Sequence, residues 1–242
     1  MHGLSASQTI GLWERGSGQH LIDRALTLLA AACPEFTPEQ VAELGIGRRD
    51  RYLLGLRENI FGPALDATAR CPRCAETVEF ALRTADLSVD TAAADQPKEF
   101  EEGGMVVRYR LLNNSDLAAI SRSAGVADAR RVLLKRCVLE ASLDGAAVGS
   151  EALSEQAVSK LAACLAEGDP QADLMLDLKC AECGHQWLIG FDISAFLWTE
   201  IDALAKRLLA EVHTLARAYG WSEADVLAMG SVRRHLYLEM VG

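Results

Sequence analysis

The positions of the hydrophobic residues predict a chain that is rich in helix. Four segments repeat apolar residues every three or four positions, the spacing of one face of an α-helix: 19–33, 48–60, 128–140 and 154–167. Thr37, followed by a proline and then by Gln40, has the pattern of a capping box and predicts a short helix. The first segment, 1–18, is polar and glycine-rich and is expected to be an arm.

Ser194 is expected to cap the longest periodic segment, a helix of about 25 residues that ends at Gly220. Its apolar stripe consists of Leu197, Ile201, Leu204, Leu208, Val212, Leu215 and Tyr219. The stripe predicts a core helix that packs against the rest of the chain. A second interpretation is that part of it, with Trp198 and Trp221, contacts another protein. Short helices are expected after it, the last of them ending at Met240.

Alternating apolar and polar residues, typical of half-buried strands, follow two short cysteine pairs. The alternating apolar positions are Val78, Phe80 and Leu82 after the first pair, and Trp187, Ile189, Phe191 and Ile193 after the second. Similar alternation predicts strands at 105–111 and 174–178. The dipeptide Asp144-Gly145 predicts a tight turn, because both residues tolerate left-handed backbone conformations.

The cysteine pairs are the strongest chemical signal in the sequence. Cys71 and Cys74 form one C-x-x-C motif, and Cys180 and Cys183 form a second one far along the chain. Together they supply the four thiolates of a tetrahedral Zn²⁺ site, and the two-residue spacer lets both sulfurs of a pair reach one ion. We therefore interpret all four as ligands of a structural Zn²⁺. Such a site has no open coordination position, which argues against zinc catalysis.

Several alternatives remain open for these cysteines. The first pair would suit a thiol-exchange site at a helix N-terminus, and an iron ion would accept the same sulfur ligands. Two disulfides would need an oxidising compartment. His185 could replace one sulfur. The strand-like residues after the first pair, and the existence of a second pair, favour a structural metal site.

The expected fold class is α+β and mostly helical, with helices packed around a small discontinuous zinc-ribbon-like β element formed by the two knuckles. We expect five consecutive parts: an N-terminal helical region (1–69), the first knuckle and its strands (70–112), an inserted helical region (113–169), the second knuckle and its strands (170–193), and a long helix with a helical tail (194–242).

Composition limits the possible partners. The 242 residues are 50% hydrophobic and 24% charged, with a formal net charge of −10. An acidic chain disfavours a nucleic-acid surface, and no apolar run is long enough to span a bilayer. The N-terminus lacks the features of a signal peptide. We therefore expect no nucleic-acid binding, no membrane insertion and a reducing, cytoplasmic compartment. The other cysteines, Cys33, Cys137 and Cys164, are expected to be inert core thiols.

The sequence contains no motif that names a reaction. It has no P-loop, no dinucleotide-binding glycine fingerprint, no G-x-S-x-G and no H-E-x-x-H. Carboxylates such as Glu200 and Asp202 are expected to be solvated or to cap helices. We expect a protein that is not an enzyme. A metal-dependent or thiol-redox enzyme remains the alternative, and a DNA-binding regulator is a further one, although the final helix offers only Arg233, Arg234 and His235.

Segments over most of the chain resemble a family of baseplate proteins from contractile-tailed bacteriophages and related contractile injection systems. The segments that carry the resemblance are 12–16, 46–50, 180–185, 196–201, 211–225 and 233–238, of which 211–225 is the most specific. The resemblance implies a baseplate component or a chaperone-like assembly factor. Its partners would be other baseplate or hub proteins, and the chain could become part of the assembled particle. Many unrelated families share the cysteine pairs, so the zinc prediction depends on the residues themselves.

Candidate contacts with such partners are aromatic or arginine residues near the N-terminus, on the long helix and in the tail. These candidates are Trp13, Trp198, Tyr219, Trp221, Arg233, Arg234 and Tyr237. The sequence does not set the oligomeric state.

Overall fold

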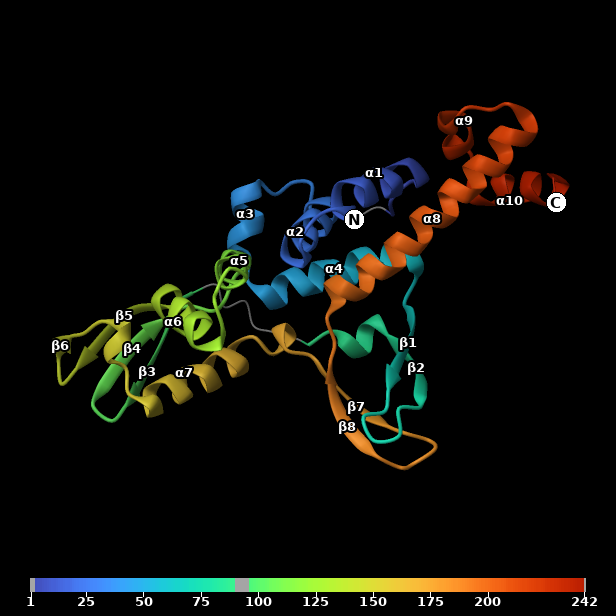
Figure 1. The fold of residues 1–242 in the computed structure, drawn as a ribbon. Helices are drawn as coiled ribbons and strands as arrows, with labels where there is room; N and C mark the ends of the chain where they lie inside the picture. The colour runs from blue at the N-terminus through green and yellow to red at the C-terminus, as the bar shows by residue number, and fades with distance from the viewer. Residues whose placement is uncertain (1–2, 90–95, 242) are drawn as a thin grey trace.

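The computed structural model describes residues 3–89 and 96–241. Figure 1 shows a helical body, two β-hairpins that project from it side by side, a small lobe with its own sheet, and C-terminal helices that extend away from the body. Helix exceeds strand, which confirms the α+β, mostly helical fold class. The sequence of residues 90–104 is typical of a loop around a short extended piece, and residues 90–95 of this segment lie outside the described part. Among the described residues, no helix is long and apolar enough to cross a membrane.

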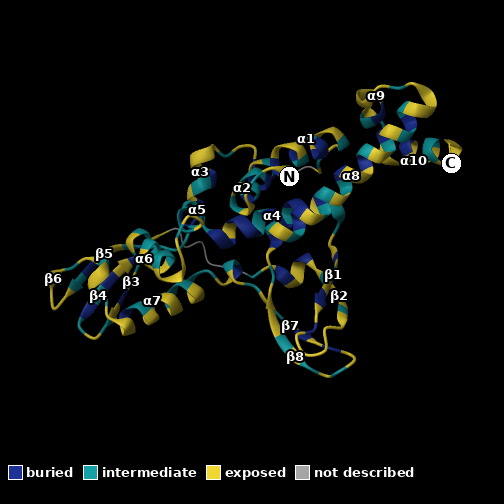
Figure 2. Cartoon of the chain, in the orientation of Figure 1, coloured by how far each residue is buried: buried dark blue, intermediate teal, exposed yellow. Residues whose placement is uncertain are grey.

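The helical body consists of four N-terminal helices and the first half of a long C-terminal helix. These are α1 (Ala6–Ser17), α2 (Leu21–Ala32), α3 (Pro38–Glu43), α4 (Ile46–Phe61) and α8 (Ile193–Tyr219). Their apolar faces form one core, which contains Leu12, Leu28, Leu53, Leu197 and Ile201. Figure 2 shows buried residues concentrated along α1, α2, α4 and the near half of α8. The apolar stripe predicted from Ser194 onward is therefore largely a core contact, and α8 begins one residue earlier, capped by Asp192.

The prediction that residues 1–18 form an arm is wrong, because this segment contains the helix α1. Ser5 and Gln8 form a capping box in which each side chain accepts a hydrogen bond from the other residue's backbone N–H. Ile10 and Leu12 are buried against the helical body. The cap and the apolar face together outweigh the glycines, of which Gly16 allows α1 to pack closely against Trp198 of α8. The capping box predicted at Thr37 and Gln40 is confirmed, and it caps the N-terminus of α3.

The paired hairpins are built from β1 (Ala64–Arg70) with β2 (Thr77–Arg83), and from β7 (Met175–Lys179) with β8 (Gln186–Gly190). A short 3₁₀ helix, η1 (Thr84–Leu87), follows the first hairpin. Another, η3 (Pro170–Ala172), precedes the second. Leu65, Leu82 and Leu176 at the base of the hairpins pack into the helical core. The hairpins therefore extend from one side of the helical body, whereas the sequence suggested helices packed around them.

The α/β lobe, residues 98–168, has an antiparallel sheet in the order β3 (Lys98–Glu102), β4 (Met105–Tyr109), β5 (Val138–Leu143), β6 (Ala146–Ala147). Helices α6 (Val126–Cys137) and α7 (Glu155–Gly168) and the 3₁₀ turn η2 (Ser150–Ala152) complete it. The helix predicted over 128–140 ends at Cys137, because the chain there pairs with β4 instead. The region 113–169 is thus not purely helical. The predicted turn is confirmed, with Asp144 and Gly145 both at positive φ.

A buried carboxylate connects the lobe to the helical body at α5 (Asn114–Ile120). Asp116 is fully buried and accepts hydrogen bonds from Arg110 at 2.6 and 2.8 Å and from Arg136 at 2.6 Å. Burial raises the pKa of Asp116, but these bonds outweigh it and hold the pKa below its usual value. The neighbouring Asn114 donates to the carbonyl of Val41 in α3. Polar contacts therefore fix the lobe to the body.

The C-terminal tip, residues 212–241, contains the end of α8, then α9 (Glu223–Ala228) and α10 (Ser231–Val241). Gly220 stops α8 in a left-handed conformation, with φ 72°, as predicted. Val212, Leu215 and Val226 form a separate small core inside the tip. Figure 1 shows the tip at the far end of α8, away from the paired hairpins.

We predict that Gly16→Ala destabilises the protein by about 1–3 kcal/mol, although alanine is intrinsically the better helix former. A Cβ at Gly16 would lie 2.4 Å from the ring of Trp198. Gly18→Ala is the matched control, since a Cβ there meets nothing within 4 Å. Chemical denaturation measures both free energies of unfolding. Equal effects of the two substitutions would contradict the packing assigned to Gly16.

We predict that Glu200→Ala costs about 2–4 kcal/mol, because it leaves the buried charge of Arg57 without its partner. The Arg57 side chain is 4% exposed and donates to both carboxylate oxygens of Glu200, at 2.7 and 3.0 Å. Glu140→Ala removes an ion pair to Arg108 that is exposed on both sides, and should cost less than about 1 kcal/mol. Urea denaturation of both variants provides the comparison.

Candidate metal centre

The four cysteines of the two C-x-x-C motifs meet at the ends of the paired hairpins. Their sulfur atoms all lie within 4.8 Å of one another. Two contacts join the hairpins, with 3.6 Å between the sulfurs of Cys71 and Cys183 and 3.6 Å between those of Cys74 and Cys180. The fold thus brings together residues that are more than a hundred positions apart in the sequence.

The two knuckles have the same backbone geometry. In the first, the N–H of Cys71 donates to the carbonyl of Glu76, and the N–H of Ala75 donates back to the carbonyl of Cys71. In the second, Cys180 bonds to the carbonyl of His185, and Gly184 bonds back to Cys180. The strands close at equivalent pairs, Arg70 with Thr77 and Lys179 with Gln186. The cluster is therefore formed by two copies of one local structure.

One position in each knuckle requires a left-handed backbone. Gly184 has φ 69° and adopts this conformation without strain, whereas Ala75 has φ 60° at the equivalent place. A non-glycine residue in this region costs on the order of 1 kcal/mol and persists only where the surrounding structure enforces it. The hairpin and its cysteines must therefore compensate for Ala75.

The sulfur cluster fits the requirements of a tetrahedral metal ion. Four thiolates at about 2.3 Å from Zn²⁺ would lie about 3.8 Å from each other. Two of the sulfur separations across the hairpins are 3.6 Å, and no two of the four sulfurs are more than 4.8 Å apart. Cys71 and Cys180 are buried, while Cys74 lies on the outside and Cys183 is intermediate. The donor set is soft and closed, which suits zinc or iron and leaves no place for a substrate.

The thiols of Cys71 and Cys74 differ in how readily they lose a proton. Burial raises the pKa of the Cys71 thiol, but hydrogen bonds from the backbone N–H groups of Cys74 and Arg73 outweigh it and lower the pKa to about 7. For Cys74, the N–H of Glu76 lowers the pKa, while the neighbouring thiols and burial raise it, to about 12 overall. The backbone thus favours one thiolate, and a second negative charge would need a cation to compensate it.

The remaining candidates for this site lie apart from the sulfurs. His185 is not part of the cluster; its ring stacks parallel to that of Trp187, 6.0 Å away. Cys33 and Cys137 are buried in the cores, as expected, and burial raises the pKa of both thiols. Cys164 is only partly buried. Among the described residues, the four cysteines are the group whose donor atoms could surround one metal ion.

Two of the candidate partner contacts, Trp13 and Trp198, pack within the helical body, where Trp13 is partly buried and Trp198 is buried. Trp13 donates from Nε1 to Oδ1 of Asp202 at 2.8 Å. The ring of Trp198 is largely buried, with the Arg24 guanidinium 4.4 Å above it and Gly16 packed against it. These residues hold α1 against α8. The prediction that Glu200 and Asp202 are solvated or cap helices is wrong for both, because Asp202 accepts from Trp13 and Glu200 accepts from Arg57.

The other candidates lie together at the C-terminal tip, and they are Tyr219, Trp221, Arg233, Arg234 and Tyr237. The rings of Tyr219 and Trp221 stack at 4.5 Å, and Tyr237 meets Trp221 edge-on at 4.8 Å. Arg234 is buried and bonds to Glu211 at 2.6 Å. The aromatic residues therefore form an internal contact of the tip, and Arg234 is enclosed within the chain.

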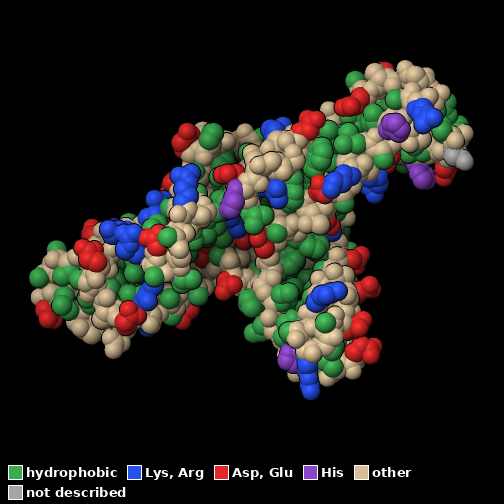
Figure 3. Space-filling model, viewed as in Figure 1, with side chains coloured by type: hydrophobic (Ala, Val, Ile, Leu, Met, Phe, Trp, Pro, Cys, Tyr) green, Lys and Arg blue, Asp and Glu red, His purple; other side chains and the backbone are tan. Residues whose placement is uncertain are grey.

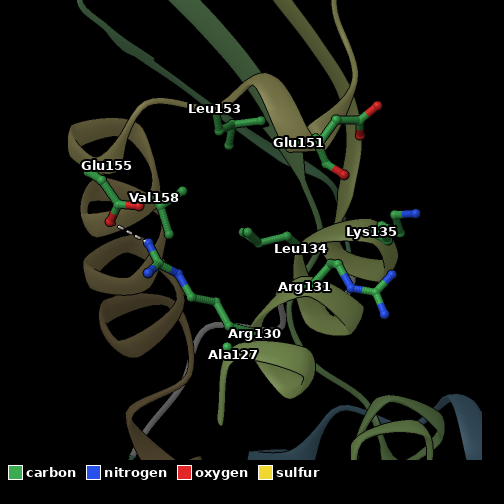
Figure 4. Close-up of a pocket in the computed structure, with 10 residues that line it drawn as sticks. Ala127, Arg130, Arg131, Leu134, Lys135, Glu151, Leu153, Glu155 and Val158 are labelled. Atoms are coloured by element: carbon green, nitrogen blue, oxygen red, sulfur yellow. Dashed lines mark hydrogen bonds and ion pairs between the residues drawn. The ribbon is translucent and has the colours of Figure 1, made fainter. Parts of the chain in front are cut away.

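A surface pocket in the α/β lobe is a feature that the sequence did not reveal. Figure 4 shows its lining from α6, η2 and α7, with Leu134, Leu153 and Val158 around an opening bordered by charged side chains. Arg130 already bonds to Glu155 across the pocket at 2.6 Å. This ion pair neutralises part of the charge that faces the opening. No sequence motif marks the residues of the pocket.

Comparisons with known proteins bear on the chain as a whole. Residues 16–198 match the family described as T4 bacteriophage base plate protein. No curated protein and no solved structure matches the chain significantly. The matched residues include both cysteine pairs and the α/β lobe, but not most of α8 or the tip, where the most specific part of the resemblance, 211–225, lies. Since the match covers well over half of the sequence, the chain belongs to the T4 bacteriophage base plate protein family.

Proposed function

We propose that this protein is a non-enzymatic baseplate component or a chaperone-like baseplate assembly factor of a contractile particle, with one structural Zn²⁺ held by Cys71, Cys74, Cys180 and Cys183. The observation that carries the proposal is the family match over residues 16–198. The meeting of the four sulfurs within that segment supports the metal. The partners would be other baseplate or hub proteins, encountered in the cytoplasm during assembly of the particle.

A structural role for the zinc follows from the position of the cluster. The cysteines lie at the free ends of the paired hairpins, whereas Leu65 and Leu176 hold the other ends in the helical core. A two-stranded hairpin is marginally stable by itself. A metal ion shared by both would fix their free ends relative to each other, giving a rigid projection for contacts with other chains. Four sulfur ligands would leave no coordination position for water or substrate.

The distribution of charged side chains over the surface favours proteins, and not nucleic acids, as the partners. Figure 3 shows acidic and basic side chains interspersed over the visible face, without the continuous basic surface that nucleic acid requires. Among the candidate contacts, Trp198 and Arg234 are buried within the chain, so we leave them out of the partner surface. Tyr219 and Arg233 at the tip remain accessible. Hydrophobic residues exposed on the second hairpin, Leu188 and Met175, extend the proposed partner surface to that hairpin.

We retain the five-part organisation of the chain as a proposal, with the change that 113–169 contributes strands to the α/β lobe. In this arrangement the lobe is an insertion between the two hairpins of the ribbon. The lobe could therefore vary in contact surface without moving the cysteines.

We predict one zinc ion per chain, measured by elemental analysis of the purified protein. Cys71→Ser and Cys180→Ser should lose the metal and lower the melting temperature by about 5–10 °C, because each removes a ligand of an ion that stabilises the fold. Hydrogen exchange should show loss of protection in the paired hairpins and not in α4. Cys164→Ser is the matched control and should keep zinc and stability. Retention of an unchanged melting profile by both ligand variants would refute the metal site.

We predict that cells which produce the particle without this chain do not complete baseplates, as seen by electron microscopy of negatively stained particles. Expression of the natural chain should restore them, Cys164→Ser should do the same, and Cys71→Ser should not. Mass spectrometry of purified particles then separates a permanent component, which is retained, from an assembly factor, which is absent. Normal particles in the complete absence of the chain would exclude both roles, whatever the metal content.

A further inference from the structure

Strand β8 of the second hairpin is exposed along its outer edge. Four of its five residues are exposed, with Leu188 at 63% and Ile189 at 36%. Ile189 pairs with Leu176, which packs against the helical core, so Ile189 lies on the inner face of the hairpin. The exposure of an inward-facing side chain indicates that no other element of the described chain covers the edge beside it. β8 is therefore an open edge strand.

The hydrogen-bond register shows which backbone groups this edge presents. The N–H groups of Cys180 and Phe191 donate to the carbonyls opposite them across the hairpin. Bonded residues of an antiparallel pair alternate with residues that point away, so the N–H and C=O groups of Gln186, Leu188 and Gly190 point away from β7. No hydrogen bond between described residues uses these groups. They can all bond to an added strand.

β8 also lacks the charged side chains that protect the other strands from such pairing. Its five residues include no Lys, Arg, Asp or Glu, whereas every other strand of five or more residues contains at least one of these. β3, the edge strand of the lobe, has four charged residues out of five. Charges on exposed edges prevent unwanted association. The absence of charge on β8 therefore indicates an edge that is kept available for pairing.

The space beside the second hairpin suits an extended segment. Figure 1 shows this hairpin on the side of the paired hairpins that faces the α/β lobe. Figure 3 shows the molecule hollowed between the lobe and the hairpins, with hydrophobic side chains on the hairpin side. An added strand needs a width of only about 5 Å. A second folded copy of the chain would bring its own lobe and helical body into the same space.

We propose that an extended, uncharged segment of another baseplate protein binds β8 as an added strand. Its backbone bonds to Gln186, Leu188 and Gly190. Its side chains beside Trp187 and Ile189 are β-branched or aromatic, because such cross-strand pairs are favourable. A charged side chain there would lose water without gaining a partner. The inference deepens the proposed function and rests on it for the kind of partner.

Selection from a library of short random peptides, with the purified full chain as the target, tests the proposal. The selected peptides should contain an uncharged run rich in Val, Ile, Thr and aromatic residues. One of them is synthesised with a fluorescent label and titrated by anisotropy. Successive N–H groups of a strand point to opposite edges, so N-methylation of alternate residues gives two forms. One form should bind about tenfold or more weakly, and the other should bind like the parent peptide.

Proline substitutions identify the edge that binds. Leu188→Pro removes an N–H that points away from β7, so the hairpin keeps its own hydrogen bonds while the added strand loses one. This variant should bind the selected peptide about tenfold or more weakly. Asp177→Pro makes the same change on the opposite edge, because Asp177 pairs with Leu188, and it should bind normally. Leu188→Glu keeps the N–H and places a charge on the edge, which should also weaken binding about tenfold.

Circular dichroism of each variant shows whether it remains folded, and Leu188→Glu decides the outcome if Leu188→Pro does not. Equal binding by the Leu188 and Asp177 variants would overturn the proposal. So would equal binding of the two N-methylated forms, or failure to select any uncharged peptide. Dimers of the natural chain that Leu188→Pro abolishes would assign the edge to a second copy and overturn the assignment to another protein. None of these results depends on whether baseplates form without the chain, so the failure of this inference is distinguishable from failure of the baseplate role.

Discussion

The rest of the structure depends on one constraint, which is the closure of a long stretch of chain. This closure brings Cys71 and Cys74 next to Cys180 and Cys183. More than a hundred residues lie between the two pairs, and closing a flexible loop of this length costs about 4 kcal/mol beyond a constant term. The helical body contributes most of the closure, because α4 and α8 pack into one core and the paired hairpins leave that core next to each other. The bond of Arg57 to Glu200 joins the same two helices close to the base of the hairpins. The sulfur cluster is thus the outer end of a contact that begins inside the helical core.

The α/β lobe is compatible with this closure because it is attached through polar contacts and has its own core. Phe100, Val107 and Leu161 pack within the lobe and not against the helical body. Asp116, with its bonds to Arg110 and Arg136, fixes the end of β4 and the end of α6 at the junction. Asn114 then connects this junction to α3. The lobe can therefore fold as a unit between the hairpins without displacing the cysteines, and it presents a surface, with its own pocket, to one side of the molecule (Figure 1, Figure 4).

The sequence was sufficient for features that local chemistry decides. Helical periodicity located the long C-terminal helix, the capping box at Thr37 located α3, and the alternation after each cysteine pair located β2 and β8. The sequence did not predict features that depend on contacts between residues far apart in the chain. The N-terminal segment was misjudged because its burial depends on α8. The first residues of β5, 138–140, were assigned to a helix because only their pairing with β4 shows that they form a strand. For the candidate site, the cysteine spacing indicated which four sulfurs lie together. The pairing of Cys71 with Cys183 across the hairpins, and the burial of Trp198, required the fold.

The order of the two knuckles along the chain has a consequence during translation. At about 5–20 residues per second, the first cysteine pair is synthesised roughly 5–20 s before the second pair. Throughout that interval the first knuckle has two thiols without their counterparts, and the backbone at Ala75 must be held by the hairpin alone. The thiols of the nascent chain are therefore exposed to oxidation at least until about three quarters of the chain has been synthesised.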